Sequence, residues 1–283
     1  MKKNVAYLNG EYVSLDVPAL HLRDLGFLRG YGVFDVSRVF EGKIFRHKEH
    51  WHRLKKSAQI LGLSLPITQQ EHGIIIQKLL SLNEKNNKDA LAIRTVLTGG
   101  VSEGGFLPEG KETFSILIED VHVLPITNYT YGVSLETLEH KRYFPEAKTI
   151  DYITPIAFRK KYPEKKDIFE ILYVWEGRIL EASTSNISIV KNGSIFSPKE
   201  DVLGGITRLV ALQIAQAGNI SVYEENVSLE QFFDADEVFI TASNKKIVPV
   251  ISVDGKKIGE GVPGKITKFL LKEYDKIIER KET

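Results

Sequence analysis

Short apolar runs, none of them long enough to cross a membrane, constrain the fold of this chain more than any other feature. The longest of them, such as ILYVW at residues 171–175, are the length of a strand, whereas a membrane-spanning helix needs about 20 residues. Strand-like runs are interrupted by stretches in which apolar residues recur every three or four positions, as they do in helices. This mixture predicts an α+β protein without transmembrane helices.

The first part of the chain predicts a compact α+β unit. VAYLNGEYVS is typical of a hairpin around Asn9-Gly10, and GVFDVSRVFEGKIFRH predicts a second strand pair around Glu41-Gly42. Apolar spacing predicts one helix from His47 and another over residues 68–83. LAIRTVLTGG and FSILIED are then expected to be strands.

The remainder of the chain is rich in strands. Strands are expected in GVSLETLEH, IFEILYVWEGRI, NISIVKNGSIF and EVFITA, and helices in TRLVALQIAQAG and residues 263–282. Residues 122–131 contain a proline and little periodicity, and are interpreted as an interdomain loop. We therefore expect a small N-terminal α+β domain at 1–121 and a larger C-terminal domain at 132–283.

Composition narrows the possible functions. The 283 residues include no cysteine, which removes disulfides, thiolate nucleophiles and cysteine zinc sites and fits a reducing compartment. No apolar run follows the first lysines, so no secretory signal is expected and the cytoplasm is the predicted location. A formal net charge of +1 gives no overall attraction to nucleic acid or to anionic membranes.

Two motifs are open to a functional and a structural interpretation. His47 and His50 in HKEHWHRL would share a helix face and could in principle bind a metal, but a solvated helix start is favoured. A metal hydrolase built on these histidines remains a rival hypothesis, although no metal is expected. The glycine-rich TGGVSEGGFLPEG lacks the strand and helix context of a dinucleotide site and is interpreted as a flexible loop.

VLGGITRLVALQIA is more informative. Two glycines precede Ile206 and Thr207, and an amphipathic helix begins there, which is an arrangement that can hold a phosphate. The alternative is that Thr207 is an ordinary N-cap. Other parts of the chain favour the phosphate site, because a lysine (Lys148), a carboxylate (Glu181) and a hydroxyl-bearing strand end (Thr241) accompany it. Together these are the groups that pyridoxal 5′-phosphate (PLP) requires.

These motifs resemble the fold-type IV, or class IV, PLP-dependent aminotransferases, which include D-amino-acid and branched-chain aminotransferases. The resemblance covers nearly the whole chain, through YLNGEYV, DLGFLRGYGVFDVSRVF, FRHKEHWHRL, EAKTIDY, ILEASTSN, GGITR, ITASN and VDGKKIGEGVPGKIT. It implies a barrel-like C-terminal domain, PLP between the two domains, and a homodimer. The reaction it implies is transfer of an amino group between an amino acid and a 2-oxo acid such as 2-oxoglutarate.

The resemblance also implies roles for individual residues. Lys148 corresponds to the lysine that attaches to the cofactor, and Glu181 to the carboxylate that pairs with the pyridine nitrogen. Phosphate contacts and ring packing are implied for Arg53, Ile206, Thr207, Thr241 and Leu203. Substrate contacts are implied for Phe34, Ala242 and Tyr152, although Tyr152 stands one residue farther from the lysine than its counterpart in branched-chain enzymes. Ser188 and Ser197 depart from the usual aromatic residue and threonine.

The substrate carboxylate needs a cation, and arginine provides the best geometry. The Arg-x-His pair of the D-amino-acid enzymes is missing from the TGGVSEGGFLP loop, and the branched-chain Tyr-x-Arg is here Ala92-Ile93-Arg94. Arg94 and Arg29, the latter on a glycine-flanked loop, are therefore the expected anchors; for Arg29 an interface or surface salt bridge is the alternative. D-amino acids are the favoured donors, with L-branched-chain amino acids as the alternative. A lyase of the aminodeoxychorismate type and a non-catalytic PLP-binding protein are further rivals.

Overall fold

The computed structural model describes residues 4–17, 20–83, 91–165 and 167–279, and the chain divides into two compact units. Unit 1 contains the chain up to His122 together with Ala147–Asp151, and unit 2 contains Val123–Glu146 and the chain from Tyr152 onward. The segment that carries Lys148 thus belongs to unit 1. The domain boundaries expected from the sequence stay a prediction. Among the described residues, no helix is both long and apolar enough to cross a membrane.

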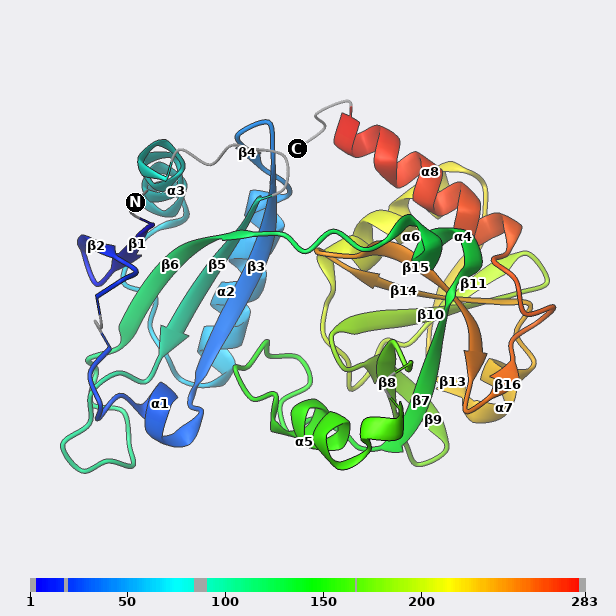
Figure 1. Ribbon diagram of the computed structural model, residues 1–283, viewed down its shortest axis with the longest axis horizontal. Helices are drawn as coiled ribbons and strands as arrows, with labels where there is room; N and C mark the ends of the chain where they lie inside the picture. The colour runs from blue at the N-terminus through cyan, green and yellow to red at the C-terminus, as the bar shows by residue number, and fades with distance from the viewer. Residues whose placement is uncertain (1–3, 18–19, 84–90, 166, 280–283) are drawn as a thin grey trace. The chain divides into compact units, whose positions relative to one another are not determined.

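Unit 1 is built on a six-stranded antiparallel sheet with the order β2-β1-β6-β5-β3-β4 (Figure 1). Its strands are β1 (Val5–Leu8), β2 (Glu11–Ser14), β3 (Gly32–Phe40), β4 (Lys43–Ile44), β5 (Leu91–Thr98) and β6 (Thr113–Asp120). Both expected hairpins are present. The first turns at Asn9 and Gly10, whose φ values of 45° and 101° explain why this pair of residues is used.

The helices of unit 1 are α1 (Leu25–Arg29), α2 (His47–Ile60) and α3 (Gln69–Leu82). Thr68 caps α3 in a capping box with Glu71, which fixes where that helix begins. Alternate residues of β3 and β5, among them Val33 and Ile93, pack against Trp51 and Leu54 of α2 in one apolar core. Phe34 and Arg94 alternate with these core residues, so they lie on the opposite face of the sheet.

Unit 2 contains a closed six-stranded barrel (Figure 1). Its strands pair in the order β10-β14-β15-β7-β8-β9, and β9 pairs with β10 to close the ring. The barrel strands are β7 (Val133–Glu139), β8 (Glu170–Trp175), β9 (Arg178–Ala182), β10 (Ser185–Lys191), β14 (Glu237–Ala242) and β15 (Lys246–Val253). The predicted α+β class with a barrel-like C-terminal part is therefore confirmed.

The other elements of unit 2 extend or cover this barrel. Short strands β11 (Ser194–Ser197), β12 (Val222–Glu224), β13 (Val227–Ser228) and β16 (Lys256–Lys257) continue the sheet, and α6 (Ile206–Ala217) packs against both α8 (Lys265–Glu279) and β14. Residues 280–282 of the last expected helix lie outside the described residues. Helices α4 (Ile126–Tyr131), α5 (Ile153–Lys161) and α7 (Leu229–Phe233), and the 3₁₀ turn at Pro163–Lys165, were not expected from the sequence, because each is short and weakly periodic.

Candidate active site

Lys148 is fixed in unit 1 by its main chain. Its N–H donates to Ser57 Oγ of α2 at 3.0 Å, and its carbonyl accepts from the N–H of Phe34 at 2.9 Å. The neighbouring Thr149 forms a bridge with Val33, so the segment pairs with the start of β3. The Lys148 amine lies 4.6 Å from the centre of the Phe34 ring.

Arg94 lies on the same face of the sheet as Phe34. Its guanidinium stands 5.3 Å from the centre of the Phe34 ring, so one aromatic ring contacts both this arginine and the Lys148 amine. Nε of Arg94 donates to both carboxylate oxygens of Glu119, at 3.0 and 2.9 Å. The side chain is 36% exposed, and its Nη groups make no hydrogen bond within the described residues.

Arg53 is held on the helical side of the sheet by Asp35. Nε and Nη2 of Arg53 donate to the two oxygens of Asp35 at 2.7 and 2.9 Å, and His50 Nδ1 lies 2.6 Å from Oδ1 of the same carboxylate. Burial opposes ionisation of Asp35, but the nearby Arg53 and His50 outweigh it and hold the pKa of this carboxyl well below its usual range. Burial, opposed by Asp35, lowers the pKa of His50, which leaves a neutral ring that donates Nδ1–H to the carboxylate.

Arg29 differs from the expectation in its local structure. It is the last residue of α1, a helix capped by Asp24 at its start and ended by Gly30 with φ of 63°, and does not lie on a loop as expected. A five-residue helix with a single buried position gives too little apolar spacing to be recognised. The side chain is exposed, and its Nη1 donates to the adjacent Leu28 carbonyl.

Glu181 in β9 is held from two sides in unit 2. Its Oε1 accepts from Nε of Arg142 at 2.8 Å, and its Oε2 accepts from the N–H of Leu203 at 3.0 Å. The Arg142 guanidinium also lies 5.3 Å from the Tyr152 ring and donates to the Ser183 carbonyl. Burial raises the pKa of Tyr152, although Arg142 opposes it, so this phenol is neutral at pH 7.

The expected phosphate site lies where β10, β14 and the start of α6 meet. Asn186 pairs with Glu181 on one side and with Thr241 on the other, and its Nδ2 donates to the Leu203 carbonyl at 2.7 Å. Gly205 is required here, because a Cβ would lie 1.8 Å from Asn186 Oδ1. Ala242 follows Thr241 as the last residue of β14.

The start of α6 corrects the alternative interpretation of Thr207. Gly205 is the N-cap, with no side-chain cap, and Thr207 is a buried residue of the first helical turn. The first N–H groups of the helix therefore lack both intrahelical partners and a capping side chain. Thr241 Oγ1 is buried and makes no hydrogen bond within the described residues. An anion with several oxygens would satisfy both sets of donors.

The two departures from the family pattern belong together. Ser188 Oγ donates to Ser197 Oγ at 2.9 Å, and Ser197 in turn accepts from Nε of Arg208 at 2.6 Å. Both serines are buried. They form one polar contact inside unit 2 and lie outside the group formed by Glu181, Asn186 and Thr241.

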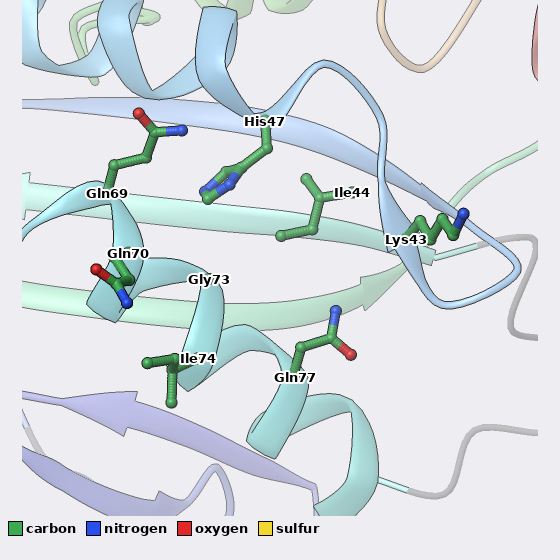
Figure 2. A pocket seen from close by; sticks show the side chains of 8 residues that line it. All are labelled: Lys43, Ile44, His47, Gln69, Gln70, Gly73, Ile74 and Gln77. Atoms are coloured by element: carbon green, nitrogen blue, oxygen red, sulfur yellow. The ribbon is translucent and has the colours of Figure 1, made fainter. Parts of the chain in front are cut away.

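The histidines of HKEHWHRL have different partners. His47 Nε2 lies 2.9 Å from Nδ1 of His72, His50 contacts Asp35, and His52 Nδ1 lies 2.7 Å from the Lys48 carbonyl. Within the described ranges, no three His, Asp or Glu side chains are grouped as a metal ion would require. His47 also borders a hollow of about 770 Å³ between β4 and α3, shown in Figure 2. No residue of the expected active site lines that hollow.

Three residues in these arrangements were missed in the sequence. Arg142 stands in the RYFPEAKTIDY stretch, and Asp35 in GVFDVSRVF, but neither has a spacing that identifies its partner. Their partners Glu181 and Arg53 are 39 and 18 residues away. Glu170 is a further buried carboxylate, whose position at the start of an apolar strand was the only available signal.

The α+β fold thus holds Lys148 by its main chain in unit 1 and carries, on the closed barrel of unit 2, a paired carboxylate and a helix start without a capping side chain. The model of the amino-transferase class IV family matches residues 32–253, and the chain belongs to this family. It is therefore a PLP-dependent class IV aminotransferase, as the sequence motifs indicated.

Relatives fall into two groups. A putative branched-chain-amino-acid aminotransferase of Methanocaldococcus jannaschii is 34% identical over 279 residues, which is 96% of this chain and 95% of that protein. A D-alanine aminotransferase of Staphylococcus aureus is 30% identical over 278 residues, covering 96% and 97%. Among solved structures, the branched-chain amino acid aminotransferase of Escherichia coli matches with a TM-score of 0.88 at 26% identity, over 98% of this chain and 95% of that one.

The residues present fit PLP. The Thr241 hydroxyl, which has no hydrogen-bond partner among the described residues, and the uncapped start of α6 provide donors for a phosphate. Glu181 provides an anion on β9, which β10 separates from the strand of Thr241. Lys148 provides the amine.

Proposed function

We propose that this enzyme transfers the amino group of a D-amino acid to a 2-oxo acid such as 2-oxoglutarate. In this proposal Lys148 is the catalytic residue, which attaches to PLP and moves a proton at the substrate Cα. Glu181 pairs with the pyridine nitrogen, Leu203 packs against the ring, and the phosphate is held by Arg53, Ile206, Thr207 and Thr241. Bound PLP supplies the electron sink that makes loss of the Cα proton possible.

The substrate side of the proposal rests on one observation. The Phe34 ring contacts both the Lys148 amine and the Arg94 guanidinium, at 4.6 and 5.3 Å. A substrate whose Cα is near the lysine can therefore present its carboxylate to the Nη groups of Arg94, which have no partner within the described chain. Ala242 and Tyr152 complete the proposed substrate site, and Arg29 is a second proposed anchor.

D-amino acids are proposed as donors because the D-alanine aminotransferases of Staphylococcus aureus align over nearly their whole length with this chain. The residue two positions before Arg94 is the small Ala92, where the branched-chain enzymes carry tyrosine according to the resemblance. L-branched-chain donors are the second candidate, supported by the relative from Methanocaldococcus jannaschii and by the fold match to the Escherichia coli enzyme.

The test is a donor screen with 2-oxoglutarate, in which both enantiomers of alanine and of leucine are compared. We expect turnover of the D-enantiomers, and turnover of L-leucine alone would overturn the stereochemical proposal. Arg94→Ala is expected to raise the donor KM by about 10- to 100-fold, since a hydrogen bond to a charged group contributes roughly 1.5–3 kcal/mol. Arg46→Ala is a matched control, because Arg46 is a half-buried arginine of unit 1 paired with Glu49.

We further propose a homodimer in the cytoplasm. Unit 1 exposes apolar side chains on two adjacent segments that are joined by the Arg23–Glu103 ion pair and by the Asp24–Val101 bridge. The exposed residues are Leu20, Leu22, Phe27, Leu28, Phe106 and Leu107. We call this set the α1 apolar surface. Exposed apolar side chains grouped on neighbouring segments are typical of protein interfaces, and Arg29 follows Leu28 of this set in the chain. The absence of cysteine supports the location.

A further inference from the structure

Unit 2 contains a buried ion pair that the proposed function does not use. Lys245 follows β14 and is 9% exposed, and Glu170 is the first residue of β8 and is 3% exposed. Nζ of Lys245 lies 2.5 Å from Oε1 of Glu170. Burial opposes ionisation of Glu170, but Lys245 and several hydrogen bonds outweigh it and lower the pKa of this carboxyl, so Glu170 is ionised at pH 7.

Glu170 accepts three hydrogen bonds from the turn between β9 and β10. Its carboxylate accepts from the Ser185 hydroxyl at 2.6 Å, from the Thr184 N–H at 2.7 Å and from the Ser183 hydroxyl at 3.3 Å. Three successive residues of one turn thus donate to a single side chain. This leaves the turn little freedom to change conformation.

Lys245 joins a second turn to the first. Its own N–H donates to the Ala242 carbonyl at 3.0 Å, which closes the turn between β14 and β15. Its Nζ donates to the hydroxyls of Thr184 and Ser185 as well as to Glu170. The Tyr129 hydroxyl holds the Lys245 carbonyl from α4 at 3.0 Å.

Both turns adjoin residues of the proposed cofactor site. Glu181 is the last-but-one residue of β9, and Thr241 and Ala242 end β14. Asn186 pairs with Glu181 and with Thr241, so the three strand ends lie side by side in the barrel. A shift of either turn would therefore move the carboxylate relative to the hydroxyl.

A buried ion pair is a poor source of stability, because desolvation of both charges offsets their attraction. Replacement of both partners by uncharged side chains is often neutral for folding, whereas removal of one partner leaves an unpaired buried charge. The ion pair of Glu170 and Lys245 is therefore better explained by the strand ends that it holds in place than by a gain in stability. It joins the end of β9, which carries Glu181, to the end of β14, which carries Thr241 and Ala242.

We propose that Glu170 and Lys245 are positioning residues, which fix the β9–β10 and β14–β15 turns so that Glu181 and Thr241 hold PLP in one register. The inference rests on the roles in PLP binding proposed above for Glu181 and Thr241. It requires cofactor retention and turnover to depend on the pair more strongly than folding does.

The experiment compares the holoenzyme with Lys245→Met, with Glu170→Gln and with the double variant. Three quantities are measured for each: the rate of PLP loss on dilution, the midpoint of thermal unfolding without PLP, and kcat and KM for the donor. For the double variant we expect an unfolding midpoint within a few degrees of the wild type. We also expect PLP loss at least about tenfold faster and a kcat at least about tenfold lower, with the lower kcat persisting at saturating PLP.

Lys246→Met is the matched control. Lys246 is the next residue along the chain, and it forms an ion pair with Asp275 of α8 at 2.6 Å. We expect this variant to keep the PLP loss rate and kcat of the wild type. If the double variant does not fold, Ser185→Ala removes two hydrogen bonds of the cluster without changing its charge, and PLP loss is expected to be several-fold faster.

Wild-type PLP loss and kcat in the folded double variant, or in Ser185→Ala if that substitute is needed, would overturn the inference. So would equal effects in Lys246→Met. Failure of the proposed function would look different, since the wild-type enzyme itself would then transfer no amino group from D-amino acids.

Discussion

Lys148 is positioned by main-chain hydrogen bonds to Ser57 and Phe34, neither of which needs its side chain. Lys148→Ala is therefore expected to abolish steady-state turnover while the thermal unfolding midpoint stays within a few degrees of the wild type. A transaminase assay and an unfolding curve measure the two effects. Borohydride reduction of the wild-type holoenzyme should attach PLP to Lys148, and an adduct on another lysine in a peptide map would refute the assignment.

Asp35 is the residue on which the orientation of Arg53 depends. Asp35→Asn would leave the buried guanidinium with a neutral partner, and breaking a buried pair typically costs about 3–5 kcal/mol. We expect a loss of stability towards the lower end of that range, together with faster loss of PLP. Urea unfolding and PLP release measure these changes. Glu49 lies on α2, as Arg53 does, and Glu49→Gln breaks the more exposed pair with Arg46. This control should change neither stability nor PLP release appreciably. Equal effects of the two variants would contradict this role of Asp35.

At the scale of elements, a histidine pair connects α2 with α3. His72 is buried between His47, the Trp51 ring and Thr95 of β5. Burial, aided by the nearby His47, lowers the pKa of His72 to about 3. An unfolded histidine has a pKa of about 6.5. Between these two pH values the unfolded chain binds a proton at His72 that the folded chain does not. The stability contributed by the neutral ring is therefore fully present above about pH 6.5 and decreases as the pH is lowered.

The free energy of unfolding should therefore decrease from pH 7 to pH 5, with His72 contributing up to about 2 kcal/mol of that decrease. Urea unfolding at the two pH values measures it. His72→Gln should reduce the dependence on pH, even if the variant is less stable at pH 7. His52→Gln is the control, because His52 is an exposed residue of α2. An unchanged pH dependence in His72→Gln would show that the buried ring is not the source.

At the scale of the whole molecule, the proposed dimer depends on the α1 apolar surface. Phe27 is 63% exposed there, two residues before Arg29. Phe27→Glu places a charge in the proposed interface and is expected to give monomers, with a raised donor KM if Arg29 acts in the partner's substrate site. Light scattering after size exclusion measures the mass. Ile74→Glu, at a similarly exposed position of α3, should remain a dimer; a dimeric Phe27→Glu would exclude this surface.

The sequence by itself determined the elements with strong local signals and the identity of the family. Hairpins at Asn9-Gly10 and Glu41-Gly42, the periodic helices and the motifs around Lys148 and Glu181 are properties of neighbouring residues, so they can be recognised without the fold. Short helices such as α1 could not be, because five residues show no period. Only the tertiary structure decided which charges pair. Arg142 meets Glu181, Arg53 meets Asp35 and Lys245 meets Glu170 across 39, 18 and 75 residues, since strand pairing in the barrel and the packing of α2 on its sheet bring together groups that no sequence spacing connects.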